Sequence, residues 1–345
     1  MAGRDLVGVP AALAQPVLTP LSGSAIFLVL AVQPGGEQAV RALLADLAGL
    51  QRAVGFRYPE GGLACVAGVG SDAWDRLFSG PRPAGLHRLP ELVGSRHQSV
   101  STPGDVLLHI RARQMFLCFE LAGQVMARLG GAVTVVDEVH GFKYWDERDL
   151  LGFVDGTENP TADAAAAAVV VSAEQDPPFA GASYVVVQKY LHDLTAWNAL
   201  AVEEQERVIG RTKLLDIEMA DEVEPASSHV ALNTITAPDG TQRQILRHNM
   251  PFGEFTRAQF GTYFIGYTAD PAVIEAMLHN MFVGSPPGNH DRILDFSTPV
   301  TGTLFFVPSA DFLADQPPVP ATAQAAETGS VTPDPSTSEG QVRDG

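Results

Sequence analysis

The sequence has only two cysteines in 345 residues. Cys65 and Cys118 each lie inside an apolar run, where a free thiol behaves as a small buried hydrophobe. The sequence also lacks a CxxC pair, an HExxH motif and any Cys-His cluster with zinc spacing. These absences exclude a disulfide framework and the common zinc motifs, and they fit a reducing compartment.

Positive charge is scarce, with 22 Lys and Arg against 40 Asp and Glu and a net charge of −18. Such a chain is repelled by phosphate backbones and anionic membrane surfaces, so we expect no nucleic-acid and no membrane partner. The apolar run at 25–32 is too short to span a bilayer, and the first twenty residues show no secretory signal. We therefore expect a cytoplasmic protein.

The sequence is 46% hydrophobic and long enough for two domains with cores of their own. In the first half, a continuous apolar run is typical of a buried strand, and apolar residues spaced three and four apart predict helices. The predicted order is strand 25–32, helix from Glu37, strand 63–69, strand 105–110, helix 115–129 and strand 132–136. This βαββαβ order is the ferredoxin-like arrangement.

The same order recurs in the second half, which indicates internal duplication. The predicted elements are strand 183–190, helix 194–209, strands near 244–246 and 261–267, helix 272–282 and strand 303–307. We expect an α+β fold with ferredoxin-like domains at 1–150 and 151–315, packed face to face as a β-sandwich flanked by helices. Residues 316–345 are rich in Pro, Ala, Ser, Thr and acids, which predicts a disordered acidic tail.

The most distinctive stretch is Leu151–Pro160, LGFVDGTENP, in which Asp155 stands between two glycines. Gly152 and Gly156 permit backbone angles closed to other residues, and Asn159-Pro160 ends regular structure. A rigid loop that presents Asp155 in a fixed direction follows from this pattern. From the segment alone, an Asx-type turn in which the aspartate bonds its own backbone is an equal alternative.

As a whole, GFVDGTENP resembles the signature of the dye-decolorizing peroxidases, haem enzymes with a distal Asp in a G-x-x-D-G motif. A second block, ILRHNMPFGE, resembles the family segment that puts an Arg and an Asn over the open face of the haem. The resemblance implies a distal site of Asp155, Arg247 and Asn249. It covers nearly all of residues 21–313 and is nearest to the bacterial group with compact domains.

The sequence has nine histidines, and none taken alone is a better candidate for a ligand than for a structural residue. Ser227–Asn233, SSHVALN, resembles the family segment that supplies the proximal haem ligand, which implies that His229 binds the iron. Its ring would donate to a carboxylate, for which Asp291 is the candidate and Asp295 the competitor that the sequence leaves open. Arg211 is the preferred partner for the haem propionates, with Arg207 as the alternative.

The resemblance thus implies one haem b per chain, bound in the C-terminal half, and peroxidase activity through a Compound I intermediate. Hydrogen peroxide and a dye, phenol or other small reductant would be the substrates. A carboxylate base stays ionised at lower pH than an imidazole, so we predict an acidic turnover optimum. The alternatives are a haem carrier or storage protein and a deferrochelatase-like enzyme that processes haem.

Two kinds of assembly are also predicted. Exposed edges on two ferredoxin-like sheets favour a homo-oligomer. Some relatives of the family carry tails that dock them inside encapsulin shells, and the cytoplasmic location would then be an encapsulin compartment. The tail here has no apolar Gly-Ser-Leu/Ile repeat, and its AETGSV stretch gives little support to an encapsulin partner.

Overall fold

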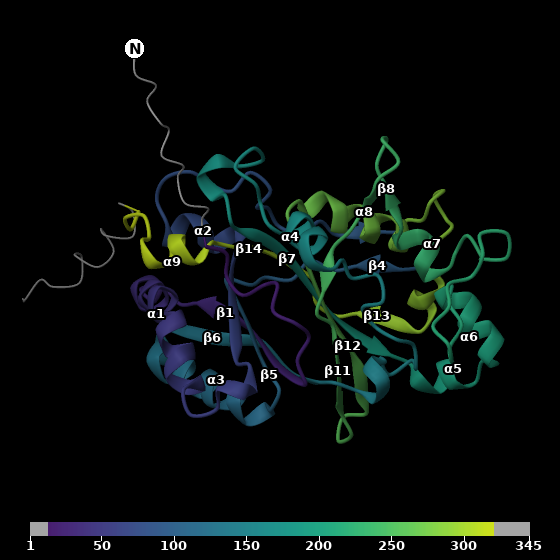
Figure 1. Ribbon diagram of the computed structural model, residues 1–345, viewed down its shortest axis with the longest axis horizontal. Helices are drawn as coiled ribbons and strands as arrows, with labels where there is room; N and C mark the ends of the chain where they lie inside the picture. Colours follow the sequence, from purple (N-terminus) through teal and green to yellow (C-terminus); the bar gives the residue numbers. More distant parts are fainter. Residues whose placement is uncertain (1–12, 321–345) are drawn as a thin grey trace, which may run out of the picture.

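The two halves of the chain repeat one order of strands and helices in the computed structural model, which describes residues 13–320. Figure 1 shows the N-terminal half, in purple and blue, beside the C-terminal half, in green and yellow. The N-terminal half contains β1 Ser24–Val32, α1 Glu37–Gly55, β2 Ala64–Gly70, α2 Ser71–Leu77, β5 Val106–Ala112, α3 Met115–Leu129 and β6 Val133–Phe142.

The C-terminal half repeats this pattern with more insertions. Its main elements are β7 Ser183–His192, α5 Leu194–Asn198, α6 Val202–Ile209, β10 Leu246–Arg247, β11 Met250–Glu254, β12 Gln259–Thr268, α8 Pro271–Phe282 and β14 Thr303–Val307. The smaller helices and strands are β3 Leu92–Val93, β4 Gln98–Ser99, α4 Ala162–Val169, α7 His229–Asn233, β8 Ile235–Thr236, β9 Gln242–Arg243, β13 Ser297–Pro299 and α9 Ala310–Ala314.

Strand order confirms the ferredoxin-like expectation in both halves. The N-terminal strands lie in the order β6-β1-β5-β2, and the C-terminal strands in the order β14-β7-β12-β10. In each half, the last strand lies beside the first, and the third separates the first from the second. All pairs along this path are antiparallel. The fold is therefore α+β, with the same motif used twice.

The two sheets also join along one edge. β14 pairs with β2 through Phe305 opposite Gly70 and Phe306 opposite Val69, which makes one ten-stranded sheet. The inner faces of the halves meet around a shared apolar core, where the Phe27 and Tyr263 rings stack with centroids 4.2 Å apart. The face-to-face packing is as expected, but this pairing occupies two of the edges expected to be free for self-association.

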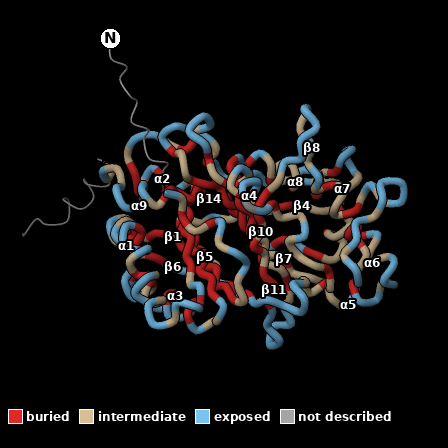
Figure 2. Tube along the Cα trace, viewed as in Figure 1, coloured by how far each residue is buried: buried red, intermediate tan, exposed pale blue. Residues whose placement is uncertain are grey.

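Helices cover the outer faces of the sheet. On α1, the predicted apolar stripe is buried; it consists of Val40, Leu43, Leu44, Leu47 and Leu50. Figure 2 shows buried residues following the strands through the centre, while the outward sides of the helices are exposed. Each such leucine contributes about 1.5–3 kcal/mol by leaving water, so the stripe fixes α1 on the sheet.

One local prediction was wrong, and two local features were not predicted. The helix expected at 194–209 is broken between α5 and α6, and Gln205 of α6 donates back to the Trp197 carbonyl. The alanine-rich α4 and the β3–β4 hairpin were not predicted. Of the predicted tail, residues 321–345 lie outside the described residues.

Within residues 13–320, no helix is long and apolar enough to cross a membrane.

Candidate active site

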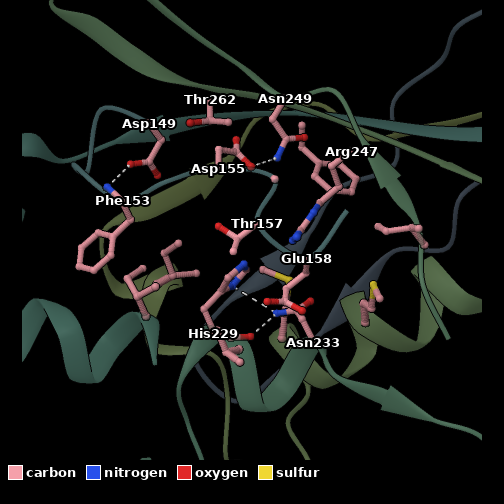
Figure 3. A pocket seen from close by; sticks show the side chains of 18 of the residues that line it. Asp149, Phe153, Asp155, Thr157, Glu158, His229, Asn233, Arg247, Asn249 and Thr262 are labelled. Atoms are coloured by element: carbon pink, nitrogen blue, oxygen red, sulfur yellow. Dashed lines mark hydrogen bonds between the residues drawn. The ribbon is translucent and has the colours of Figure 1, made fainter. Parts of the chain in front are cut away.

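A cavity in the C-terminal half is lined by most of the site residues expected from sequence. Asp155, Gly156, Arg211, His229, Arg247 and Asn249 all belong to its wall. In Figure 3, Asp155, Asn249 and Arg247 lie on one side of the cavity, and His229 lies on the opposite side. The structure thus brings together side chains that are up to 94 residues apart in sequence, as with Asp155 and Asn249.

The loop that carries Asp155 depends on its glycines. Gly152 has φ of +93° and Gly156 has φ of +84°, which are left-handed conformations that favour glycine. A Cβ at Gly152 would lie 2.6 Å from Cε of Lys213. The Asp155 amide donates to the Glu147 carbonyl at 2.9 Å, which closes the loop. The loop is therefore held by its backbone, and the Asp155 side chain is free to face the cavity.

Asn159 ties this loop to the strand that carries Arg247. Its Nδ2 donates to the Arg247 carbonyl at 2.8 Å, and its Oδ1 accepts from the Arg247 amide at 2.8 Å. The Asn159 side-chain amide thus makes the same two hydrogen bonds to the Arg247 backbone that a neighbouring strand would make. It fixes the position of Arg247 relative to Asp155.

Asn249 holds the Asp155 carboxylate in place. The Ile265 amide donates to Asn249 Oδ1 at 3.0 Å, so Nδ2 is the group that faces Asp155, and it donates to Asp155 Oδ1 at 3.1 Å. Nε of Arg247 is buried and has no hydrogen-bond partner among the described residues. The side of the cavity formed by these residues therefore has an oriented carboxylate and an arginine whose buried Nε has no partner among the described residues.

On the opposite side, His229 is the first residue of α7. Ser228 caps this helix, because its Oγ accepts from the Ala231 amide at 3.0 Å. His229 Nδ1 lies 2.7 Å from Asp291 Oδ2. Since the Asp291 carboxylate can only accept, Nδ1 carries the proton and Nε2 has its lone pair free for a metal.

Asp291 is fully buried, and its hydrogen bonds explain why a carboxylate is tolerated there. One oxygen bonds His229 and lies 3.3 Å from Asn233 Nδ2; the other accepts from the Ile293 amide at 3.0 Å. Asp295, the other candidate partner, instead bonds His97 and His290. The open choice between the two acids is resolved in favour of Asp291 as the residue that contacts His229.

Asp149 is a further acid in the cavity wall, close to Asp155 (Figure 3). Burial raises the pKa of Asp149 to about 7, and the nearby Asp155 carboxylate adds to this effect. Three backbone hydrogen bonds oppose the rise, among them that from the Phe153 amide at 3.0 Å. Asp149 therefore changes protonation state near neutral pH.

Arg211 lines the cavity, and its guanidinium is bonded to three carboxylates. It contacts Glu158 at 2.8 Å, Asp216 at 2.9 Å and Glu218 at 2.9 Å. The alternative, Arg207, has a side chain that is 63% exposed and lies 4.0 Å from Glu204. Of the two arginines, Arg211 is the one positioned at the cavity.

The rest of the wall fits a flat, largely apolar group. Between the two polar sides lie mainly apolar side chains, among them Phe153, Ile209, Val230, Ile245, Phe264, Ile274, Met277, Leu278, Met281 and Ile293. A histidine with a free Nε2, backed by a buried carboxylate, is the usual axial arrangement in haem peroxidases. Together with the acid and arginine opposite, these features define the class of the protein as a haem peroxidase.

Comparison with known proteins identifies the family. Residues 14–143 match the family described as Dyp-type peroxidase, N-terminal, and residues 146–312 match Dyp-type peroxidase, C-terminal. A dye-decolorizing peroxidase of Rhodococcus erythropolis is 64% identical over 309 residues, which cover 90% of each chain. The chain belongs to the Dyp-type, or dye-decolorizing, peroxidase family, whose members are haem-dependent oxidoreductases acting on peroxide.

Solved structures agree with this assignment. The encapsulated DyP-type peroxidase from Mycobacterium smegmatis has a TM-score of 0.88 and 58% identity, over 90% of this chain and 100% of that chain. A variant of DypB from Rhodococcus jostii in complex with haem has a TM-score of 0.85 and 55% identity, over 88% of this chain and 99% of that chain. The fold and the haem requirement expected from sequence are both confirmed.

Sequence analysis missed two residues of the site. Asp149 precedes the glycine motif in an ordinary polar segment, and nothing in its neighbours signals burial. Asn233 lies four residues after His229, and its Nδ2 donates to the His229 carbonyl at 2.8 Å. The two residues lie one turn apart on α7, but no helix was predicted there, so the i,i+4 spacing gave no signal from sequence alone.

Proposed function

We propose that the chain reduces hydrogen peroxide at a haem bound by His229, and that it then oxidises dyes, phenols or other one-electron donors. The observation that carries the proposal is the placement of Asp155 and Arg247 opposite His229 across one apolar cavity. A protein that only stores haem has no use for an oriented acid and an arginine at the open side.

On the proximal side, His229 Nε2 would hold the iron. Asp291 keeps the proton on Nδ1 and increases the basicity of the ring, and Asn233 supports this contact from the same helix. Haem, when bound, supplies the electrons that cleave the peroxide bond and later accepts electrons from the reductant. The protein's part on this side is to fix one ring orientation and one tautomer.

On the distal side, Asp155 would act as the base. It takes the proton from one peroxide oxygen and returns it to the other, which then leaves as water. Arg247 stabilises the negative charge that develops on the leaving oxygen. Asn249 has a positioning role. Its Nδ2 donates to Asp155 Oδ1, and its Oδ1 is fixed by the Ile265 amide of β12.

Arg211 is proposed to bind a haem propionate. A propionate would replace one of its present carboxylate partners. Glu158 and Glu218 share Nη1 and are both exposed, and of the two Glu158 is suited to leave because it lines the cavity. A bidentate arginine contact would then fix one edge of the haem. Gly152 and Gly156 contribute by permitting the loop shape beside the bound cofactor.

Product analysis distinguishes this function from its alternatives. The haem-loaded protein is mixed with hydrogen peroxide and a reporter dye, and dye oxidation, free iron and intact porphyrin are measured together. We expect many turnovers of dye with porphyrin retained. Release of iron or an opened porphyrin without dye turnover would support a haem-processing enzyme, and no change in any product would support a carrier.

We also infer the organisation of the chain around this site. The separate family matches to 14–143 and 146–312 support the proposed domains at 1–150 and 151–315. Because the M. smegmatis relative is an encapsulated enzyme, an encapsulin shell is a partner to test here by co-expression with and without residues 321–345. A homo-oligomer remains a prediction, and light scattering of the haem-loaded protein measures it.

A further inference from the structure

Three metal-binding side chains meet at a point where the two halves of the chain are in contact. His97 Nε2 lies 3.0 Å from Asp295 Oδ1, and His290 Nε2 lies 3.3 Å from the same oxygen. The two imidazole rings have centroids 4.9 Å apart. One potential ligand atom from each residue lies within 4.8 Å of the other two.

The two distances from Asp295 Oδ1 are close to the donor–donor spacing of a metal coordination shell. In a tetrahedral zinc site, each Zn–N bond to histidine is about 2.0–2.1 Å long, so neighbouring donor atoms lie about 3.3–3.4 Å apart. The three donor atoms, all within 4.8 Å of one another, therefore lie close enough to share one ion. Two imidazoles and one carboxylate form a donor set used by zinc and by related divalent metals.

The exposure of the three side chains suits an ion that also binds water. His97 is 23% exposed, His290 is 12% exposed and Asp295 is 21% exposed. The site is thus reachable from solvent, with room for water as a fourth ligand. Arg96 and Arg292 lie 3.9 and 3.8 Å from Asp295, and their charge makes the site weaker than one without them.

The three residues come from two segments that lie far apart in the sequence. His97 belongs to the connection of the β3–β4 hairpin, where the Gly94 amide donates to the His97 carbonyl at 2.9 Å. His290 and Asp295 flank Asp291, and Asp295 ends the 3-10 helix η5, Arg292–Asp295. An ion at this point would link a hairpin of the N-terminal half to the segment that holds the partner of His229.

We propose that His97, His290 and Asp295 form a binding site for one divalent transition-metal ion of the zinc class, separate from the haem iron. The ion would act as a structural clamp on residues 290–295 and so support the position of Asp291. This proposal does not depend on the roles assigned to Asp155 and Arg247.

The test is equilibrium dialysis of the haem-loaded full chain against zinc chloride after treatment with a chelator, with bound zinc and iron measured by mass spectrometry. We expect one zinc per chain in the parent, in addition to the haem iron. His97→Ala and Asp295→Asn should each weaken zinc binding at least tenfold. His87→Ala is the matched control, because His87 is an exposed histidine paired with Glu275 outside the cluster.

Thermal unfolding gives a second readout that does not depend on activity. Zinc should raise the unfolding temperature of the parent and of His87→Ala, and it should leave His97→Ala unchanged. If the parent binds no zinc at millimolar concentration, the proposal is overturned, whatever the variants do. It is also overturned if His97→Ala and Asp295→Asn, with normal circular dichroism, bind zinc as the parent does.

Discussion

Asp149 should make the stability of this protein depend on pH, and the change Asp149→Asn tests this. Asp149 is half-buried in the cavity wall, and desolvation of its carboxyl, together with the neighbouring Asp155, raises its pKa from 3.8 to about 7. Asn is close to Asp in size and keeps an oxygen that can accept from the Phe153 amide. The substitution therefore removes the titration with little change in packing.

The sign and size follow from proton binding. Between pH 3.8 and about 7, the folded protein keeps a proton on Asp149 that the unfolded chain has lost. The free energy of unfolding of the parent therefore falls as pH rises through this window, by about 1.4 kcal/mol per pH unit. Over the whole window the contribution of this one group is about 4 kcal/mol, and above pH 7 it is constant.

Urea unfolding of the haem-loaded parent and of Asp149→Asn, from pH 4 to pH 8, measures the effect. As pH rises, the free energy of unfolding of the variant should increase relative to that of the parent by several kcal/mol. Asp221→Asn, at an exposed position, is the control for removal of a negative charge. Parallel curves for parent and Asp149→Asn would refute the reasoning.

Three further outcomes are expected. Asp291→Ala should weaken haem retention about 10–100-fold, since it removes the acceptor that holds His229; haem transfer to apomyoglobin measures this. Gly156→Ala should destabilise the fold by about 1–2 kcal/mol in urea unfolding, because alanine is strained at φ of +84°. Gly240→Ala is the control, because Gly240 has the same φ but open space around it; any extra loss at Gly156 then comes from the contact with Asn159. Phe306→Ala should cost about 3–5 kcal/mol in the same assay, because the ring is fully buried against Trp74 and Tyr184.

Much of the fold could be predicted from local sequence pattern. Helices α1 and α3 were found because their apolar residues recur on one face, and the buried strands because they form continuous apolar runs. The pairing of β14 with β2 could not be predicted, because it joins segments more than 200 residues apart and involves two residues on each strand. At the break between α5 and α6, Gln205 bonds the Trp197 carbonyl, a side-chain contact that periodicity does not reveal.

The site divides in a similar way. Motif resemblance located Asp155, His229, Arg247 and Asn249, and the structure places all four around one cavity. The sequence left Asp291 and Asp295 as alternatives, because both are acids in the same short segment. Only the hydrogen bonds distinguish them, with Asp291 on His229 and Asp295 on His97 and His290.

The central claim is that Asp155 and Arg247 cleave peroxide at a haem held by His229. Rapid mixing of the haem-loaded protein with one equivalent of hydrogen peroxide, followed by its absorption spectrum, tests this most directly. The Soret band should drop and shift within milliseconds in the parent and in Arg257→Leu, an exposed arginine used as control. It should respond far more slowly in Asp155→Asn, in Arg247→Leu or in both, and the slower variant identifies the dominant residue. An unchanged spectrum in the parent, or equal rates in all four proteins, would contradict the account.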